Sequence, residues 1–142
     1  MRVDDKIRDT IVAIGGVDSR GRFVPFGTGF VVVNQIEEDF YQNIVTARHV
    51  VDGVEAAFGD GEVRVRANTR DGGALVLPAP IWHRHQDENV DITIGPGGMD
   101  REVFSIRMFE CGSELILTPD HIEKNDIGVG DDIFAVGMFV QR

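Results

Sequence analysis

The chain has 142 residues, a length that suits a single hydrophobic core, and we expect residues 1–142 to form one domain. Twenty-four acidic residues against fourteen basic ones give a formal net charge of −10. This balance argues against nucleic acids and anionic membrane surfaces as partners, because both attract clustered positive charge. No apolar run approaches the roughly 20 residues that cross a bilayer.

The N-terminal residues and the cysteine count bear on location and redox chemistry. Residues 1–6 are polar and lead into only a short apolar stretch, which is not typical of a signal peptide, so the sequence predicts a cytoplasmic protein. An exported protein with its signal removed would have the same sequence. Cys111 is the single cysteine, which excludes an internal disulfide and the usual zinc spacings. We expect Cys111 to be a buried small hydrophobic residue, and we expect no cofactor.

Glycine is unusually frequent, with 17 of the 142 residues against a usual share of roughly 7%. The glycines separate short runs of β-branched and aromatic residues, such as 30–33, and no apolar face recurs at a helical period. These features indicate an all-β domain. Many short strands with frequent turns are typical of a small barrel or a sandwich.

The predicted strands carry different signals. Strand 23–33 is interrupted by two glycines, where missing side chains allow a bend or a close backbone approach. Residues 62–67 alternate strictly, as in a strand with one buried face, and two prolines restrict 74–82 to an edge or an irregular segment. In chain order we expect strands over 10–14, 23–33, 41–46, 62–67, 74–82, 91–94, 103–109, 114–117 and 132–136, with one short helical turn over 47–53.

Four segments carry motifs in a recognisable order: G-T-G-F-V-V at 27–32, I-V-T-A-R-H-V-V at 44–51, N-V-D-I-T-I at 89–94 and G-D-D-I-F-A-V-G at 130–137. This order resembles the N-terminal half of trypsin-like serine peptidases, especially the HtrA-like branch, in which a G-S/T-G-F strand precedes T-A-x-H-V. The resemblance covers roughly residues 8–138. It implies a six-stranded antiparallel Greek-key β-barrel, the first of the two barrels of that fold.

The resemblance implies a role for two residues. His49 would be the general base and Asp91 the acid that orients it, while Thr93 stands where alanine is commoner. A serine hydroxyl needs an imidazole to take its proton, and the imidazole needs a buried carboxylate on its other nitrogen. An isolated histidine at a strand end is most often structural, but the T-A-R-H-V context and Asp91 favour the catalytic interpretation. Asp87 and Glu88 lie in a polar turn and are expected to be solvated.

The nucleophile of such peptidases lies in a G-D/N-S-G-G turn on the second barrel. The serines of this chain are Ser19, Ser105 and Ser113, and Ser113 is nearest to a turn nucleophile but lacks the glycines that build an oxyanion hole. We therefore expect the base-and-acid half of a serine endopeptidase, inactive alone, which acts on polypeptides together with a second barrel. The exposed face between the barrels is a candidate homo-oligomer interface. The alternative is a non-catalytic β-barrel that binds peptides or a partner protein.

Two other clusters suggest weaker interpretations. His83 and His85 lie on one face of a strand near Glu88, but their spacing does not match a cupin metal motif, so we predict a solvated turn and no metal site. The glycine-rich segment 95–98 resembles a phosphate loop, but no helix with Lys and Ser/Thr follows it, so we predict a turn there as well.

Overall fold

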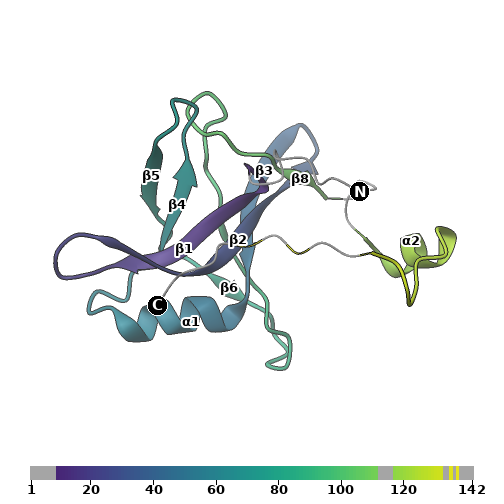
Figure 1. The fold of residues 1–142 in the computed structure, drawn as a ribbon, viewed down its shortest axis with the longest axis horizontal. Coiled ribbons are helices and arrows are strands. Elements are labelled where there is room, and N and C mark those ends of the chain that lie inside the picture. The colour runs from purple at the N-terminus through teal and green to yellow at the C-terminus, as the bar shows by residue number, and fades with distance from the viewer. Residues whose placement is uncertain (1–8, 112–116, 133–134, 136, 138–142) are drawn as a thin grey trace.

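The computed structural model of the chain describes residues 9–111, 117–132, 135 and 137. These residues form eight strands and two helices (Figure 1). In chain order the elements are β1 (Ile11–Val17), β2 (Phe23–Ile36), β3 (Asp39–Thr46), α1 (Arg48–Ala57), β4 (Arg64–Asn68), β5 (Ala74–Pro78), β6 (His83–Arg84), β7 (Thr93–Pro96), β8 (Phe109–Glu110) and α2 (Pro119–Lys124). The strands expected over 114–117 and 132–136 lie partly outside the described residues.

The strands form an 8-stranded sheet in the order β5-β4-β1-β2-β3-β7-β6, and the short β8 pairs with β2. Neighbours along this order run antiparallel, whereas β8 runs parallel to β2. Among the described residues β5 and β6 form the two ends of the order, so the sheet is not closed. The all-β class expected from the sequence is confirmed at this level.

The core is built from the central strands and one face of α1. Along β4 the side chains alternate as the sequence predicted, since Val65 and Ala67 are buried and Arg66 is exposed. Burial of each aliphatic side chain stabilises the fold by about 1.5–3 kcal/mol, so the apolar face of α1 fastens this helix to the sheet. The larger core side chains are Val12, Ile14, Val31, Ile44, Val51, Val54, Val65, Trp82, Met99 and Phe104.

Helix α1 is longer than predicted, since it runs over Arg48–Ala57 instead of ending as a turn near Gly53. Gly53 lies inside the helix, and the next residue, Val54, is fully buried. A helix is held chiefly by the packing of its apolar face, which outweighs the roughly 1 kcal/mol cost of one internal glycine.

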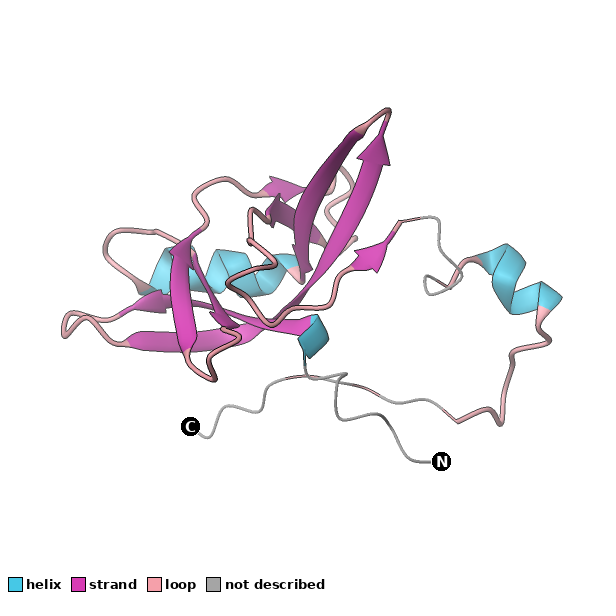
Figure 2. Cartoon of the chain, turned by 90° about the horizontal axis from the view of Figure 1, so that it is seen from above, coloured by secondary structure: helices cyan, strands magenta, loops and turns pink. Residues whose placement is uncertain are grey.

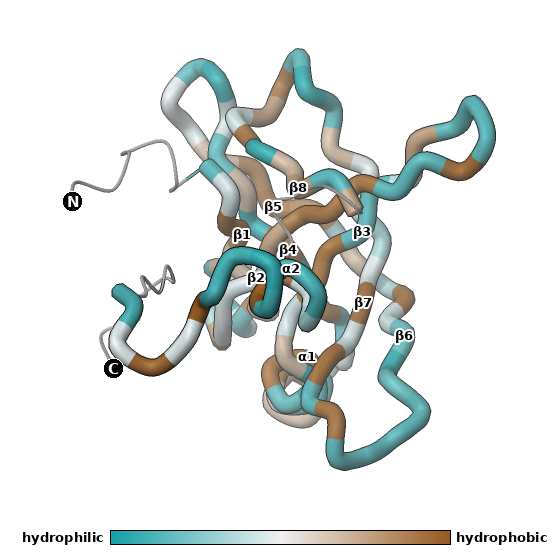
Figure 3. The backbone as a smooth tube through the Cα atoms, turned by 90° about the vertical axis from the view of Figure 1, so that its right-hand side faces the viewer, coloured by the Kyte–Doolittle hydropathy of each residue, from teal (hydrophilic) through white to brown (hydrophobic). Residues whose placement is uncertain are grey.

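Helix α2 was not predicted, although its start carries ordinary sequence signals. Thr118 Oγ1 accepts the N–H of His121 (3.3 Å), and Pro119 occupies the first turn. The helix has no buried residue, is mostly hydrophilic (Figure 3) and lies apart from the sheet (Figures 1 and 2). Within the described residues, neither helix has the length and apolar character needed to span a membrane.

Several predicted boundaries on the later strands are wrong. Strand 74–82 ends at Pro78, because proline has no N–H to extend the ladder. Segment 103–109 is not one strand: Val103 and Phe104 both donate their N–H to the carbonyl of Asp100, which turns the chain, and only Phe109 enters β8. The glycine-rich segment is not all turn, since its first two residues belong to β7. Cys111, expected to be buried, follows β8 at the surface and is exposed.

Candidate active site

His49 lies in the first turn of α1, directly after β3. The buried Thr46 ends β3, and its Oγ1 donates to the carbonyl of Thr28 in β2 (2.9 Å). A Cβ atom on Gly27 would lie 2.6 Å from Cγ2 of Val50, so only glycine lets α1 approach β2 this closely. The T-A-R-H-V and G-T-G-F segments therefore contact each other, and together they fix the position of His49.

Asp91 binds the first turn of α1 through three of its atoms. Its Oδ1 accepts the backbone N–H of His49 (2.9 Å), and its carbonyl accepts the N–H of Arg48 (3.4 Å). Its Oδ2 lies 2.5 Å from Nδ1 of the His49 ring. The residue before the helix, Ala47, supplies no side-chain cap, so a carboxylate from 42 residues further along the chain caps α1 in its place.

The same contacts set the charge of the pair. The hydrogen bond from the backbone N–H of His49, followed by that from its ring, lowers the pKa of the Asp91 carboxyl below its ordinary value of 3.8. Asp91 is therefore ionised at neutral pH and can only accept hydrogen bonds, which requires Nδ1 to carry the proton. Nε2 of His49 has no hydrogen-bond partner among the described residues and is available to accept a proton.

The pair is more exposed than the triad chemistry led us to expect. The side chain of His49 is 74% exposed and that of Asp91 is 54% exposed. Asp91 also precedes the strand instead of starting it, because β7 begins at Thr93, which is fully buried. The structure thus brings together the two residues that the sequence selected, at the surface end of α1 and not in the core.

The serines show no such constellation in the part of the chain that is described. Ser19 is exposed in the turn between β1 and β2, and Ser105 is half-buried with its N–H donated to the carbonyl of Asn68 (3.0 Å). Neither hydrogen-bonds to His49, and Ser113 lies outside the described residues. Asp87 and Glu88 are exposed as expected, and Asp87 Oδ1 accepts the N–H of Asn89 within the turn.

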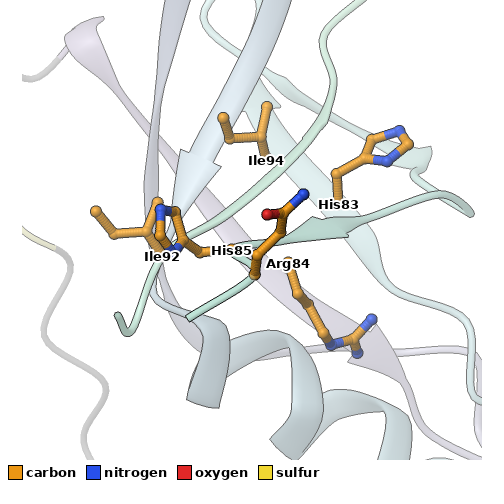
Figure 4. A pocket seen from close by; sticks show the side chains of 6 residues that line it. His83, Arg84, His85, Ile92 and Ile94 are labelled. Carbon is orange, nitrogen blue, oxygen red and sulfur yellow. The ribbon is translucent and has the colours of Figure 1, made fainter. Parts of the chain in front are cut away.

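A pocket of about 370 Å³ lies on the outer face of the β6–β7 hairpin (Figure 4). His83 and His85 both line it, whereas the guanidinium group of Arg84 points toward α1. No group of three or more potential metal-ligating His, Cys, Asp or Glu side chains occurs among the described residues. The complete lining is His83, Arg84, His85, Gln86, Ile92 and Ile94.

The ion pairs that Arg84 makes were not predicted from the sequence. Its guanidinium binds Asp52 and Glu55, which lie on adjacent turns of α1. The predicted helical turn ended before Glu55. Asp52 and Glu55, which are three residues apart, were therefore not expected to lie on one face of a helix.

Comparisons with known proteins identify no relative: no family model, curated protein or solved structure matches this chain.

Proposed function

We propose that this chain is the first barrel of a trypsin-like serine endopeptidase of the HtrA-like type, with His49 as general base and Asp91 as the residue that orients it. One observation carries the proposal. A single carboxylate binds both the backbone N–H and the ring Nδ1 of His49, which fixes the ring's position and its tautomer together.

The proposed fold is a six-stranded antiparallel Greek-key barrel. The antiparallel pairing of β1 with β2, β2 with β3 and β3 with β7 supports it. So does Gly137 in the fourth motif, where a Cβ atom would lie 3.8 Å from Oγ1 of Thr28 in the first motif. Gly137 therefore lies close to β2.

The proposed reaction is hydrolysis of a peptide bond. Nε2 of His49 takes the proton of a serine hydroxyl as the serine oxygen bonds to the peptide carbonyl carbon, and Asp91 stabilises the imidazolium that forms. Nε2 then gives this proton to the leaving amine as the C–N bond breaks. Water releases the acyl group by the same two steps. The serine and the oxyanion-hole donors come from the second barrel, so this chain alone is inactive.

The surface around the pair supports a covered interface. Ile92 and Ile94 flank the buried Thr93 and are 47% and 40% exposed. In the proposal, the second barrel, or a second copy of this chain in a homo-oligomer, covers these two side chains as well as His49 and Asp91.

The test is labelling by a fluorophosphonate probe, which reacts with activated serines. This chain alone should remain unlabelled at Ser19, Ser105 and Ser113. A longer protein that contains this chain and a second barrel should be labelled, and His49→Ala should reduce the labelling by several orders of magnitude, because triad members act as a unit. His121→Ala, in the separate helix α2, is the control and should leave labelling unchanged.

The open pocket on the β6–β7 hairpin favours a second candidate function, a non-catalytic barrel that binds peptides or a partner protein. A folded two-barrel protein that resists the probe would support this candidate and contradict the peptidase. Labelling of the 142-residue chain itself would also contradict the half-enzyme proposal, with Ser113 as the first serine to examine.

A further inference from the structure

Helix α1 is fastened to the β6–β7 hairpin at two separate points. The first point is Asp91, which binds the N–H groups of Arg48 and His49 in the first turn. The second point is Arg84, which binds acidic side chains on the following turns. Both anchoring residues belong to one hairpin.

The Arg84 contacts are multiple and directional. Its Nε and Nη2 donate to Oδ1 of Asp52 (2.9 and 2.8 Å), and Nη2 also donates to Oε2 of Glu55 (2.6 Å). Arg48 extends the network, since its Nε lies 3.4 Å from the other oxygen of Asp52. The hydrogen bond to Asp52 and the charges of both acids raise the pKa of Arg84, so the guanidinium stays charged.

The hairpin connects the two points rigidly. Arg84 pairs with Thr93 across the ladder, and Thr93 Oγ1 donates to the carbonyl of His83 (3.0 Å). The N–H of His85 donates to the carbonyl of Ile92 (3.3 Å), one residue after Asp91. A shift of α1 relative to Arg84 is therefore also a shift relative to Asp91.

We propose that Arg84 is a positioning residue for the His49–Asp91 pair, an inference that rests on the proposed function. Asp52 and Glu55 place two negative charges on the face of α1 that faces the hairpin. Arg84 neutralises these two charges. It also holds α1 at the rotation at which the backbone N–H and ring Nδ1 of His49 contact the two oxygens of Asp91.

This role predicts an effect on the site without a large effect on stability. The side chains of Arg84, Asp52 and Glu55 are 33%, 44% and 41% exposed, and ion pairs at such sites stabilise a fold only weakly. Global stability is thus a poor readout. The Asp91 carboxyl is a direct readout, because its pKa depends on the hydrogen bonds from His49.

The test is NMR titration of the Asp91 side-chain carboxyl in this chain, together with hydrogen exchange of the His49 amide. In Arg84→Met we expect the Asp91 pKa to rise toward 3.8 and the His49 amide to exchange faster. The control is Arg22→Met. Arg22 makes a similar two-nitrogen contact with Asp18, but in the β1–β2 turn, and its loss should move neither quantity.

A second variant removes the acidic partners of Arg84 instead of Arg84 itself. It tests the same contact if Arg84→Met does not fold. Asp52→Asn with Glu55→Gln keeps Arg84 and should move the Asp91 pKa in the same direction. Unchanged Asp91 pKa and His49 exchange in a folded variant would overturn the positioning role. This outcome is distinct from failure of the proposed function, since the titration needs no serine and the probe experiment needs no change at Arg84.

Discussion

Asp91 combines two tasks that usually fall to different residues. Its Oδ1 caps helix α1 and its Oδ2 binds the ring of His49, so the contact that caps the helix also places the imidazole beside the carboxylate. The motifs identified both residues from the sequence, because each lies in a distinctive local pattern. The capping contact was not predictable, since no local signal relates Asp91 to the helix residue His49, which lies 42 positions earlier.

The lowered pKa of Asp91 has a consequence for acid stability. As the pH falls, Asp91 takes up a proton near pH 3.8 in the unfolded chain and only at a lower pH in the folded chain. The stability that this carboxylate contributes is therefore lost as the pH falls through its folded pKa. Asp91→Asn should therefore flatten the decline in the free energy of unfolding below pH 3.8. Urea unfolding at a series of pH values measures this decline.

The matched control for the acid-stability experiment is Asp39→Asn. The Asp39 side chain has no hydrogen bond or ion pair among the described residues, so this variant should retain the wild-type decline. An equal decline in wild type and Asp91→Asn would show that the Asp91 contacts do not form in solution.

At the level of elements, packing between α1 and β2 determines where His49 lies. The two glycines in β2 were expected to allow a bend or a close backbone approach, and at Gly27 the missing side chain leaves room for Val50 of α1. The predicted length of α1 was wrong, because the turn was expected to end at Gly53. Packing of the apolar face of the helix outweighs the cost of this internal glycine. The start of α2 has ordinary sequence signals in Thr118, which caps it, and in Pro119, which occupies its first turn.

This contact predicts the effect of Gly27→Ala. The added methyl group would overlap Val50, so α1 must shift, at a cost of about 1–3 kcal/mol in the free energy of unfolding. The amide and ring resonances of His49 should move as well. Chemical denaturation and NMR measure the two effects.

Gly59→Ala is the control for Gly27→Ala. No atom lies within 4 Å of a Cβ at Gly59, so the change in stability should stay within about 0.5 kcal/mol. Equal stabilities for the two variants would contradict the close packing of α1 on β2.

At the level of the whole molecule, glycine frequency and strand-forming runs were sufficient to predict the all-β class. They could not predict the sheet order, because β4 and β7 pair with β1 and β3 across long stretches of sequence. The proposed closure of the barrel and its second-barrel partner rest on the resemblance and on the exposed surface around His49. The ion pairs of Arg84 could not be predicted either, because they join a helix and a hairpin that are far apart in the sequence.

The most direct test of the central claim, that Asp91 orients His49 as a general base, is the ¹⁵N NMR tautomer of the neutral His49 ring. We expect the proton on Nδ1, since the Asp91 carboxylate can only accept a hydrogen bond. In Asp91→Asn the backbone N–H of His49 still needs an acceptor, so the Asn oxygen should take the position of Oδ1. The Asn side-chain nitrogen then lies against Nδ1 and donates to it, which should move the ring proton to Nε2. The ring of His83 should not respond. A neutral wild-type His49 with its proton on Nε2, or a tautomer that Asp91→Asn does not change, would show that Asp91 does not orient His49.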